Sequence, residues 1–76
     1  MRTYIKKERY MDFCRNAQIY GFRRKNGVYS TTRNGYYIVV KNSGQIIAWY
    51  CGKQITDITY EIIPSLVWDG YIRKYE

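Results

Sequence analysis

The sequence contains no histidine, and this absence removes several classes of catalytic and metal site. Histidine is the commonest general base and the commonest metal-binding side chain in proteins. A Ser-His-Asp or Cys-His mechanism is therefore impossible within these 76 residues. The glycine-rich fingerprints that bind phosphates, G-x-x-x-x-G-K-S/T and G-x-G-x-x-G, are also missing. We expect a protein that is not an enzyme and that uses no cofactor, metal or small-molecule substrate.

Only two cysteines are present, Cys14 and Cys51, too few to complete a four-ligand zinc site. One disulfide could join them if a helix packs its Cys14 face on the strand that carries Cys51. The sequence favours two buried free thiols instead, because Lys6 and Lys7 interrupt the segment where a signal peptide would stay apolar. No apolar run approaches the roughly 20 residues of a membrane span. We expect a cytoplasmic protein with no membrane partner.

The length allows one domain, and we expect a single domain over residues 1–76. A domain of this size buries only about 60% of its unfolded surface, so its core is small. The hydrophobic share of 46% is that of a folded protein and argues against disorder.

Residues 4–20 have the pattern of an amphipathic helix. Its apolar side chains recur at the i, i+3, i+4, i+7 spacing of one helical face; they are Tyr10, Phe13, Cys14, Ala17 and Tyr20. Thr3 can serve as the N-cap, and Gly21 suits the left-handed residue that follows a helix.

After Gly21 the apolar period changes to two, which is typical of strands. The turn signals between the apolar runs are Asn26-Gly27, Asn34-Gly35, Asn42-Ser43-Gly44, Gly52-Lys53 and Asp69-Gly70. The runs predicted as strands are 28–33, 36–41, 45–51 and 56–63. The C-terminal segment fits either a last hairpin, with strands at 66–68 and 71–73, or a short helix from Ser65. We predict an α+β fold, with an N-terminal amphipathic helix packed on a four- to five-stranded antiparallel β-meander.

The net charge of +7 is distributed unevenly along the chain. Residues 1–33 contain nine cations against Glu8 and Asp12, whereas residues 34–76 contain four charges of each sign. The whole excess therefore belongs to the helix and the first hairpin, and such asymmetry indicates an acidic or polyanionic partner. The densest cluster, Arg23-Arg24-Lys25, lies beside the Asn26-Gly27 turn; its alternative role is to prevent edge-to-edge strand pairing.

Ten tyrosines accompany the cations. Four of them are our core candidates: Tyr10, Tyr20, Tyr50 and Tyr60. Tyrosine anchors protein interfaces and also stacks on unpaired bases. We expect the helix and first-hairpin cations, with three tyrosines next to them, to form the nucleic-acid or partner site: Lys6, Lys7, Arg15, Arg23, Arg24, Lys25, Tyr29, Arg33, Tyr36 and Tyr37.

The turn spacing of this chain resembles that of a known DNA-binding sheet. The segments Gly27-Val28, 36–40 and 47–50 are similar to the three-stranded DNA-reading sheet of AP2-type domains, which implies contact between a sheet and DNA. The helix that follows the sheet in that family has no counterpart here. The double-stranded-RNA-binding domain also begins with a helix and three strands, but the Lys-rich signature of its second helix is absent.

Two functions follow from these features. The first is a regulatory binding protein that acts on a nucleic-acid-handling system and docks through a basic, Tyr-rich face on nucleic acid or on a nucleic-acid-processing complex. The alternative is a small phage or mobile-element inhibitor, which the composition resembles in style, such as an anti-CRISPR protein that occludes a host protein. A third reading is a structural subunit whose strand edges pair between copies.

Overall fold

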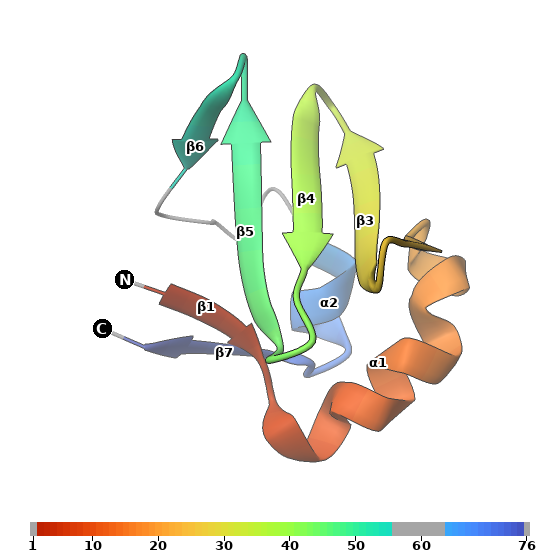
Figure 1. Cartoon of the computed structure of the whole chain (residues 1–76). Coiled ribbons are helices and arrows are strands. Elements are labelled where there is room, and N and C mark those ends of the chain that lie inside the picture. Colours follow the sequence, from red (N-terminus) through yellow and green to blue (C-terminus); the bar gives the residue numbers. More distant parts are fainter. Residues whose placement is uncertain (1, 56–63, 76) are drawn as a thin grey trace.

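The computed structural model describes residues 2–55 and 64–75 and confirms the α+β fold, with an N-terminal helix on an antiparallel sheet (Figure 1). The helical segments are the 3-10 helix η1 (Lys7–Arg9), α1 (Tyr10–Asn16), the 3-10 helix η2 (Ala17–Tyr20) and α2 (Pro64–Trp68). The strands are β1 (Arg2–Ile5), β2 (Arg23–Lys25), β3 (Val28–Arg33), β4 (Tyr36–Val40), β5 (Gln45–Tyr50), β6 (Lys53–Ile55) and β7 (Ile72–Tyr75).

Strands β2 to β6 form an antiparallel meander in which β3, β4 and β5 correspond to predicted strands, and three of its connections are two-residue turns. Both central residues of each turn have positive φ, which is the requirement of a type I′ hairpin. The φ values are 53° and 80° at Asn26-Gly27, 52° and 81° at Asn34-Gly35, and 53° and 78° at Cys51-Gly52. The last turn lies one residue before the predicted Gly52-Lys53 position, and β6 follows it at once. The strand predicted over 56–63 lies outside the described residues.

The strand order is β2-β3-β4-β5-β1-β7, and all pairs are antiparallel. Two strands pair with the edge of β5 that faces away from β4. Strand β1 pairs with Gln45 and Ile46, and β6 pairs with residues 48–50. Figure 1 shows β1 and β7 running across the lower end of β5, and α2 lying behind the upright strands. The N-terminal strand therefore joins the meander to the end of the chain.

The prediction that the helix covers residues 4–20 was wrong at its start. Residues Arg2–Ile5 form β1, and the helical region begins only at Lys7. Thr3 does not cap a helix; it is buried in β1 opposite Ile46. Pairing with β5 and β7 on both sides satisfies the β1 backbone, and this tertiary gain outweighs local helix propensity.

A glycine in the left-handed region ends both helical segments, as the sequence predicted for Gly21. Gly21 has φ 85°, its N–H donates to the Gln18 carbonyl, and the Phe22 N–H donates to the Ala17 carbonyl. The same pair of Schellman hydrogen bonds closes α2 around Gly70 (φ 75°). Of the two predictions for the C-terminal segment, the short helix is therefore the one that the structure contains, and β7 begins only after it.

The core lies between the helical segments and one face of the sheet. Its buried side chains are Ile5, Phe13, Ala17, Phe22, Ile38, Val40, Ile46, Ala48, Leu66 and Tyr71. Phe13 occupies the centre and makes edge-to-face contacts with Phe22, Tyr29 and Tyr71, at centroid distances of 5.3, 5.5 and 6.2 Å. Burial of each large apolar side chain contributes about 1.5–3 kcal/mol.

Some expectations about individual core residues were wrong. Tyr50, a predicted core residue, is 46% exposed. Tyr71 was not among the predicted core residues, but it is buried. Tyr10 and Tyr20 do pack against the core, and Tyr60 lies outside the described residues. Both cysteines are free thiols, but only Cys14 is half-buried; Cys51 is exposed because it occupies the β5–β6 turn.

Candidate functional site

The three cations of β2 point to two sides of the sheet. Arg24 pairs with Tyr29, whose ring contacts the core residue Phe13, so Arg24 shares the helical side of the sheet. Arg23 and Lys25 point to the other side, because successive side chains of a strand alternate. All three are exposed, and β2 is an edge strand. A single strand therefore presents cations to both faces of the sheet.

A groove of about 510 Å³ lies between the helix and the β2–β3 hairpin. Arg15 from α1 and Arg24 from β2 have their side chains on this side of the sheet, and Arg23 borders the groove from the edge strand β2 although its side chain points to the other face. No carboxylate is among the lining residues. We call this feature the basic groove. Its floor is formed by residues such as Ala17 and Phe22 that also belong to the core. The groove combines rigid apolar walls with several donors for an anion.

One carboxylate beside the basic groove offsets part of its charge. Asp12 forms ion pairs with Arg15 at 2.5 Å and with Arg9 at 3.7 Å. The Arg15 side chain is nevertheless 70% exposed and that of Asp12 is 44% exposed. Exposed ion pairs contribute only about 0–1 kcal/mol, so Arg15 can exchange this partner for a phosphate at little cost.

Tyr29 is half-buried, and its ring supports a cation. The Arg24 guanidinium carbon lies 5.2 Å from the Tyr29 ring centroid, within cation–π distance. The Tyr29 hydroxyl donates to the Cys14 carbonyl at 3.4 Å, and its ring packs on Phe13. Tyr29 thus belongs to the wall of the basic groove, where it supports Arg24.

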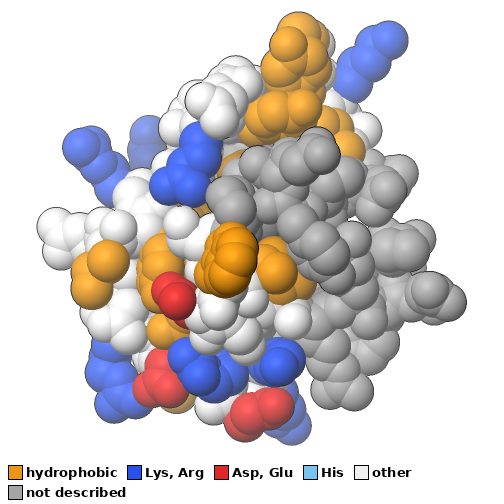
Figure 2. Space-filling view, turned by 180° about the vertical axis from the view of Figure 1, so that it is seen from behind, with side chains coloured by type: hydrophobic (Ala, Val, Ile, Leu, Met, Phe, Trp, Pro, Cys, Tyr) orange, Lys and Arg blue, Asp and Glu red, His pale blue; other side chains and the backbone are white. Residues whose placement is uncertain are grey.

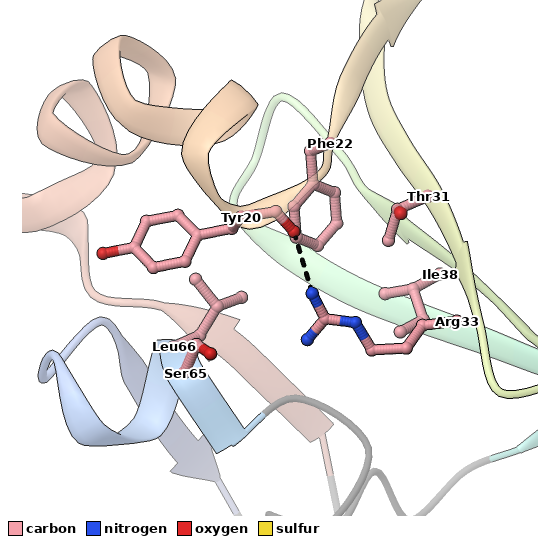
Figure 3. A pocket seen from close by; sticks show the side chains of 7 residues that line it. All are labelled: Tyr20, Phe22, Thr31, Arg33, Ile38, Ser65 and Leu66. Carbon is pink, nitrogen blue, oxygen red and sulfur yellow. Dashed lines mark hydrogen bonds between the residues drawn. The ribbon is translucent and has the colours of Figure 1, made fainter.

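Arg33 is engaged inside the fold. Figure 3 shows its side chain extending from β3 toward the end of η2, where its Nη2 donates to the Tyr20 carbonyl at 3.2 Å. It borders a cavity of about 10 Å³, with space for about one water molecule, which Ile38 and Leu66 also line. Half-buried Arg33 satisfies a helix-end carbonyl and does not join the basic groove.

Lys6 and Lys7 lie where the helical region begins and are not among the lining residues of the basic groove. Lys7 is exposed and borders a second hollow of about 400 Å³ together with Tyr10 and Asn42. Lys6 is half-buried, and its backbone N–H donates to the Tyr71 carbonyl. The structure thus brings three of the seven predicted cations to one groove, with Lys25 next to it on β2.

Tyr36 and Tyr37 point to opposite faces of β4. Tyr36 pairs with Tyr50 at a centroid distance of 4.7 Å, and Tyr37 pairs with Trp49 at 5.7 Å. Tyr37 is 45% exposed. Trp49 and Tyr50 were not among the predicted site residues, because their pairing with Tyr37 and Tyr36 depends on the register between β4 and β5.

A polar cluster ties the helix to the C-terminal segment. The Tyr20 hydroxyl donates to the Asp69 carboxylate, and this hydrogen bond raises the pKa of Tyr20. Arg9 lies over the Tyr71 ring at 4.4 Å, and its hydrogen bond to the Tyr71 hydroxyl, together with that of Asn16, lowers the pKa of Tyr71. This cluster connects structural elements far apart in the sequence.

Over residues 2–55 and 64–75 the structure holds no group of three or more Cys, Asp or Glu side chains arranged to bind a metal ion. Within those same ranges, no helix is long and apolar enough to cross a membrane. Comparison with protein-family models, curated proteins and solved structures found no significant match.

Proposed function

We propose that this protein binds nucleic acid, without a catalytic role, as a regulatory component of a nucleic-acid-handling system. The observation that carries this proposal is the basic groove, lined by Arg15, Arg23 and Arg24 and by no carboxylate. Arginine offers up to five N–H donors in a planar fork that matches phosphate oxygens. Phosphate groups of a nucleic-acid backbone are the polyanion that best fits several arginines along one groove.

The charge of the chain supports the same partner. A net charge of +7 on 76 residues attracts polyanions and raises their rate of encounter. Each phosphate that is neutralised releases condensed counterions, so the affinity must fall steeply as salt is added. An interface dominated by buried tyrosine would respond far less to salt.

The test is fluorescence anisotropy with labelled single- and double-stranded DNA and RNA, at about 50 and 200 mM salt. We expect binding at the lower salt concentration and a large loss of affinity at the higher one. Arg15→Glu and Arg24→Glu, both at the basic groove, should each weaken binding uniformly across sequences and reduce the salt slope by about one or more. Lys53→Glu is the matched control, since Lys53 is exposed on β6 and does not line the groove. Absence of binding to every probe at low salt would contradict the proposal.

A second candidate is a small inhibitor that occludes a host protein, as some phage and mobile-element proteins do. The observation that favours it is the exposure of two large apolar side chains of the helical segments, Trp68 at 85% and Ile19 at 78%. Exposed tryptophan is enriched among the anchors of protein interfaces. Loss of a captured protein partner in Trp68→Ala, with nucleic-acid affinity unchanged, would establish this second function.

A further inference from the structure

The side chains of β3, β4 and β5 alternate between the core and a second face, which none of the described helices covers. The cross-strand register aligns Ser30, Val39 and Ile47 in one row, and Thr32, Tyr37 and Trp49 in the next. These six residues face away from the buried partners of the helices, and we call this surface the open face. Figure 1 looks onto these strands, with α2 behind them. Among the described elements, both α1 and α2 pack on the other face.

The open face is apolar at its centre and carries an accessible pair of aromatic rings. Val39, Ile47 and Trp49 are half-buried, although they occupy central strands, and Tyr37 is 45% exposed. The Tyr37 and Trp49 rings are 5.7 Å apart and inclined by 38°, so they form one continuous aromatic surface across β4 and β5. Exposed apolar surface of this kind marks an interaction site.

The charges around the open face select the partner. Arg23 and Lys25 point to this side from β2 and are exposed, so cations flank its edge. The three carboxylates that the structure describes, Glu8, Asp12 and Asp69, all lie in helical segments or directly after one. Figure 2 shows acidic side chains among cations on the side opposite to that of Figure 1. The described part of the open face therefore combines aromatic rings and cations with no acidic side chain.

We propose that the open face binds the unpaired bases of single-stranded nucleic acid, which stack on Tyr37 and Trp49 while Arg23 and Lys25 contact phosphates. This inference rests on the proposed function and specifies its ligand. Neighbouring β-strands lie about 4.8 Å apart, so Tyr37 on β4 is roughly 10 Å from β2. One nucleic-acid strand can therefore contact both the Tyr37 ring and the cations of β2. A duplex hides the faces of its bases, and only an unpaired strand can use exposed rings in this way.

The fluorescence of Trp49 can report directly whether a base stacks on the open face. The chain has two tryptophans, so Trp68→Phe, at a position that is 85% exposed, leaves Trp49 as the sole tryptophan. In this background we titrate oligothymidylate and a duplex of the same length. We expect Trp49 fluorescence to be quenched by the single strand and not by the duplex, because quenching requires a base against the indole.

Two variants test the energetic contribution of the rings. Tyr37→Ala should weaken single-strand binding by about 5- to 150-fold, the range found for loss of one stacked base, and leave duplex binding unchanged. The matched control is Tyr50→Ala, because Tyr50 is equally exposed at 46% but points to the opposite face. Thr32→Glu should also weaken single-strand binding, since Thr32 is exposed beside Tyr37 and its replacement leaves the core intact.

The outcomes separate the two proposals. The open-face inference would be overturned if the single strand binds without quenching Trp49 fluorescence. It would also be overturned if Tyr37→Ala and Tyr50→Ala lose equal affinity for the single strand. Either result would point to a protein partner for this surface. The proposed function would then still stand if Arg24→Glu weakens binding of both strands and duplexes. If neither probe binds at low salt, the proposed function and this inference fail together.

Discussion

The guanidinium of Arg9 lies over the ring of Tyr71, 4.4 Å from its centroid, and links the start of the helix to the residue that precedes β7. Tyr71 is buried, and Asn16 also donates to its hydroxyl, at 3.4 Å. Hydrogen bonds from these two side chains favour the ionised phenol, so the pKa of Tyr71 lies below its ordinary value of 10.0. The contact therefore has a signature that titration can detect.

Replacement of Arg9 should restore the ordinary titration of Tyr71. In Arg9→Met the aliphatic stem remains but the charge and the donor are lost, so the pKa of Tyr71 should rise toward or above 10. Tyrosine ring-carbon NMR during a pH titration measures this directly. Lys7→Met is the control, because it removes a nearby charge that makes no contact with the Tyr71 ring among the described interactions. An unchanged Tyr71 titration in Arg9→Met would contradict the assigned cause.

Tyr20 should make the stability of the protein fall in alkaline solution. Its hydrogen bond to Asp69 raises its pKa in the folded state, so the folded protein holds this proton more tightly than the unfolded chain does. The stabilisation is complete below the unfolded pKa of about 10 and is lost as the pH rises through the folded pKa.

Urea unfolding of the wild type and of Tyr20→Phe, at pH values from 8 to about 11, tests this linkage. Tyr20→Phe should be less stable at pH 8, and its unfolding free energy should fall less steeply above pH 10 than that of the wild type. Parallel curves for the two proteins would show that Tyr20 titrates equally in both states.

The hairpins could be predicted from the sequence because their determinants are local. Asn-Gly pairs supply positive φ at two adjacent positions, and strand alternation follows from each turn. Strand β1 could not be found in this way, because its partners β5 and β7 lie far along the chain and its own residues also fit a helix. The cations were visible in the composition, but their division between the basic groove and the open face depends on register.

Arg33 illustrates the same limit for a single side chain. Its place next to the Asn34-Gly35 turn suggested an exposed cation, yet it reaches the Tyr20 carbonyl across the core face. Arg33→Met should reduce the unfolding free energy by about 1–3 kcal/mol, because a charge-assisted hydrogen bond is lost and a helix-end carbonyl loses its donor. It should change nucleic-acid affinity less than Arg24→Glu does. Thermal unfolding and anisotropy on the same samples compare the two effects, and the reverse ranking would return Arg33 to the binding site.

The two Asn-Gly turns should respond differently to the same substitution. Gly27 and Gly35 have nearly equal positive φ, 80° and 81°, so alanine is strained at both, by about 1 kcal/mol. A Cβ at Gly27 meets nothing within 4 Å, whereas a Cβ at Gly35 would lie 3.2 Å from the Tyr50 ring. Gly35→Ala must therefore also shift the Tyr50 ring by a few tenths of an ångström, which disturbs its packing on Tyr36 at 4.7 Å.

We expect Gly35→Ala to cost about 0.5–1.5 kcal/mol more than Gly27→Ala, since aromatic pairs contribute energies of that size beyond their buried area. Urea denaturation of both variants measures the difference. The same pair in a Tyr50→Ala background completes a double-mutant cycle, in which the excess cost should vanish because the obstructing ring is gone. If the excess persists there, the extra strain lies in the backbone of the β3–β4 turn and not in the contact with Tyr50.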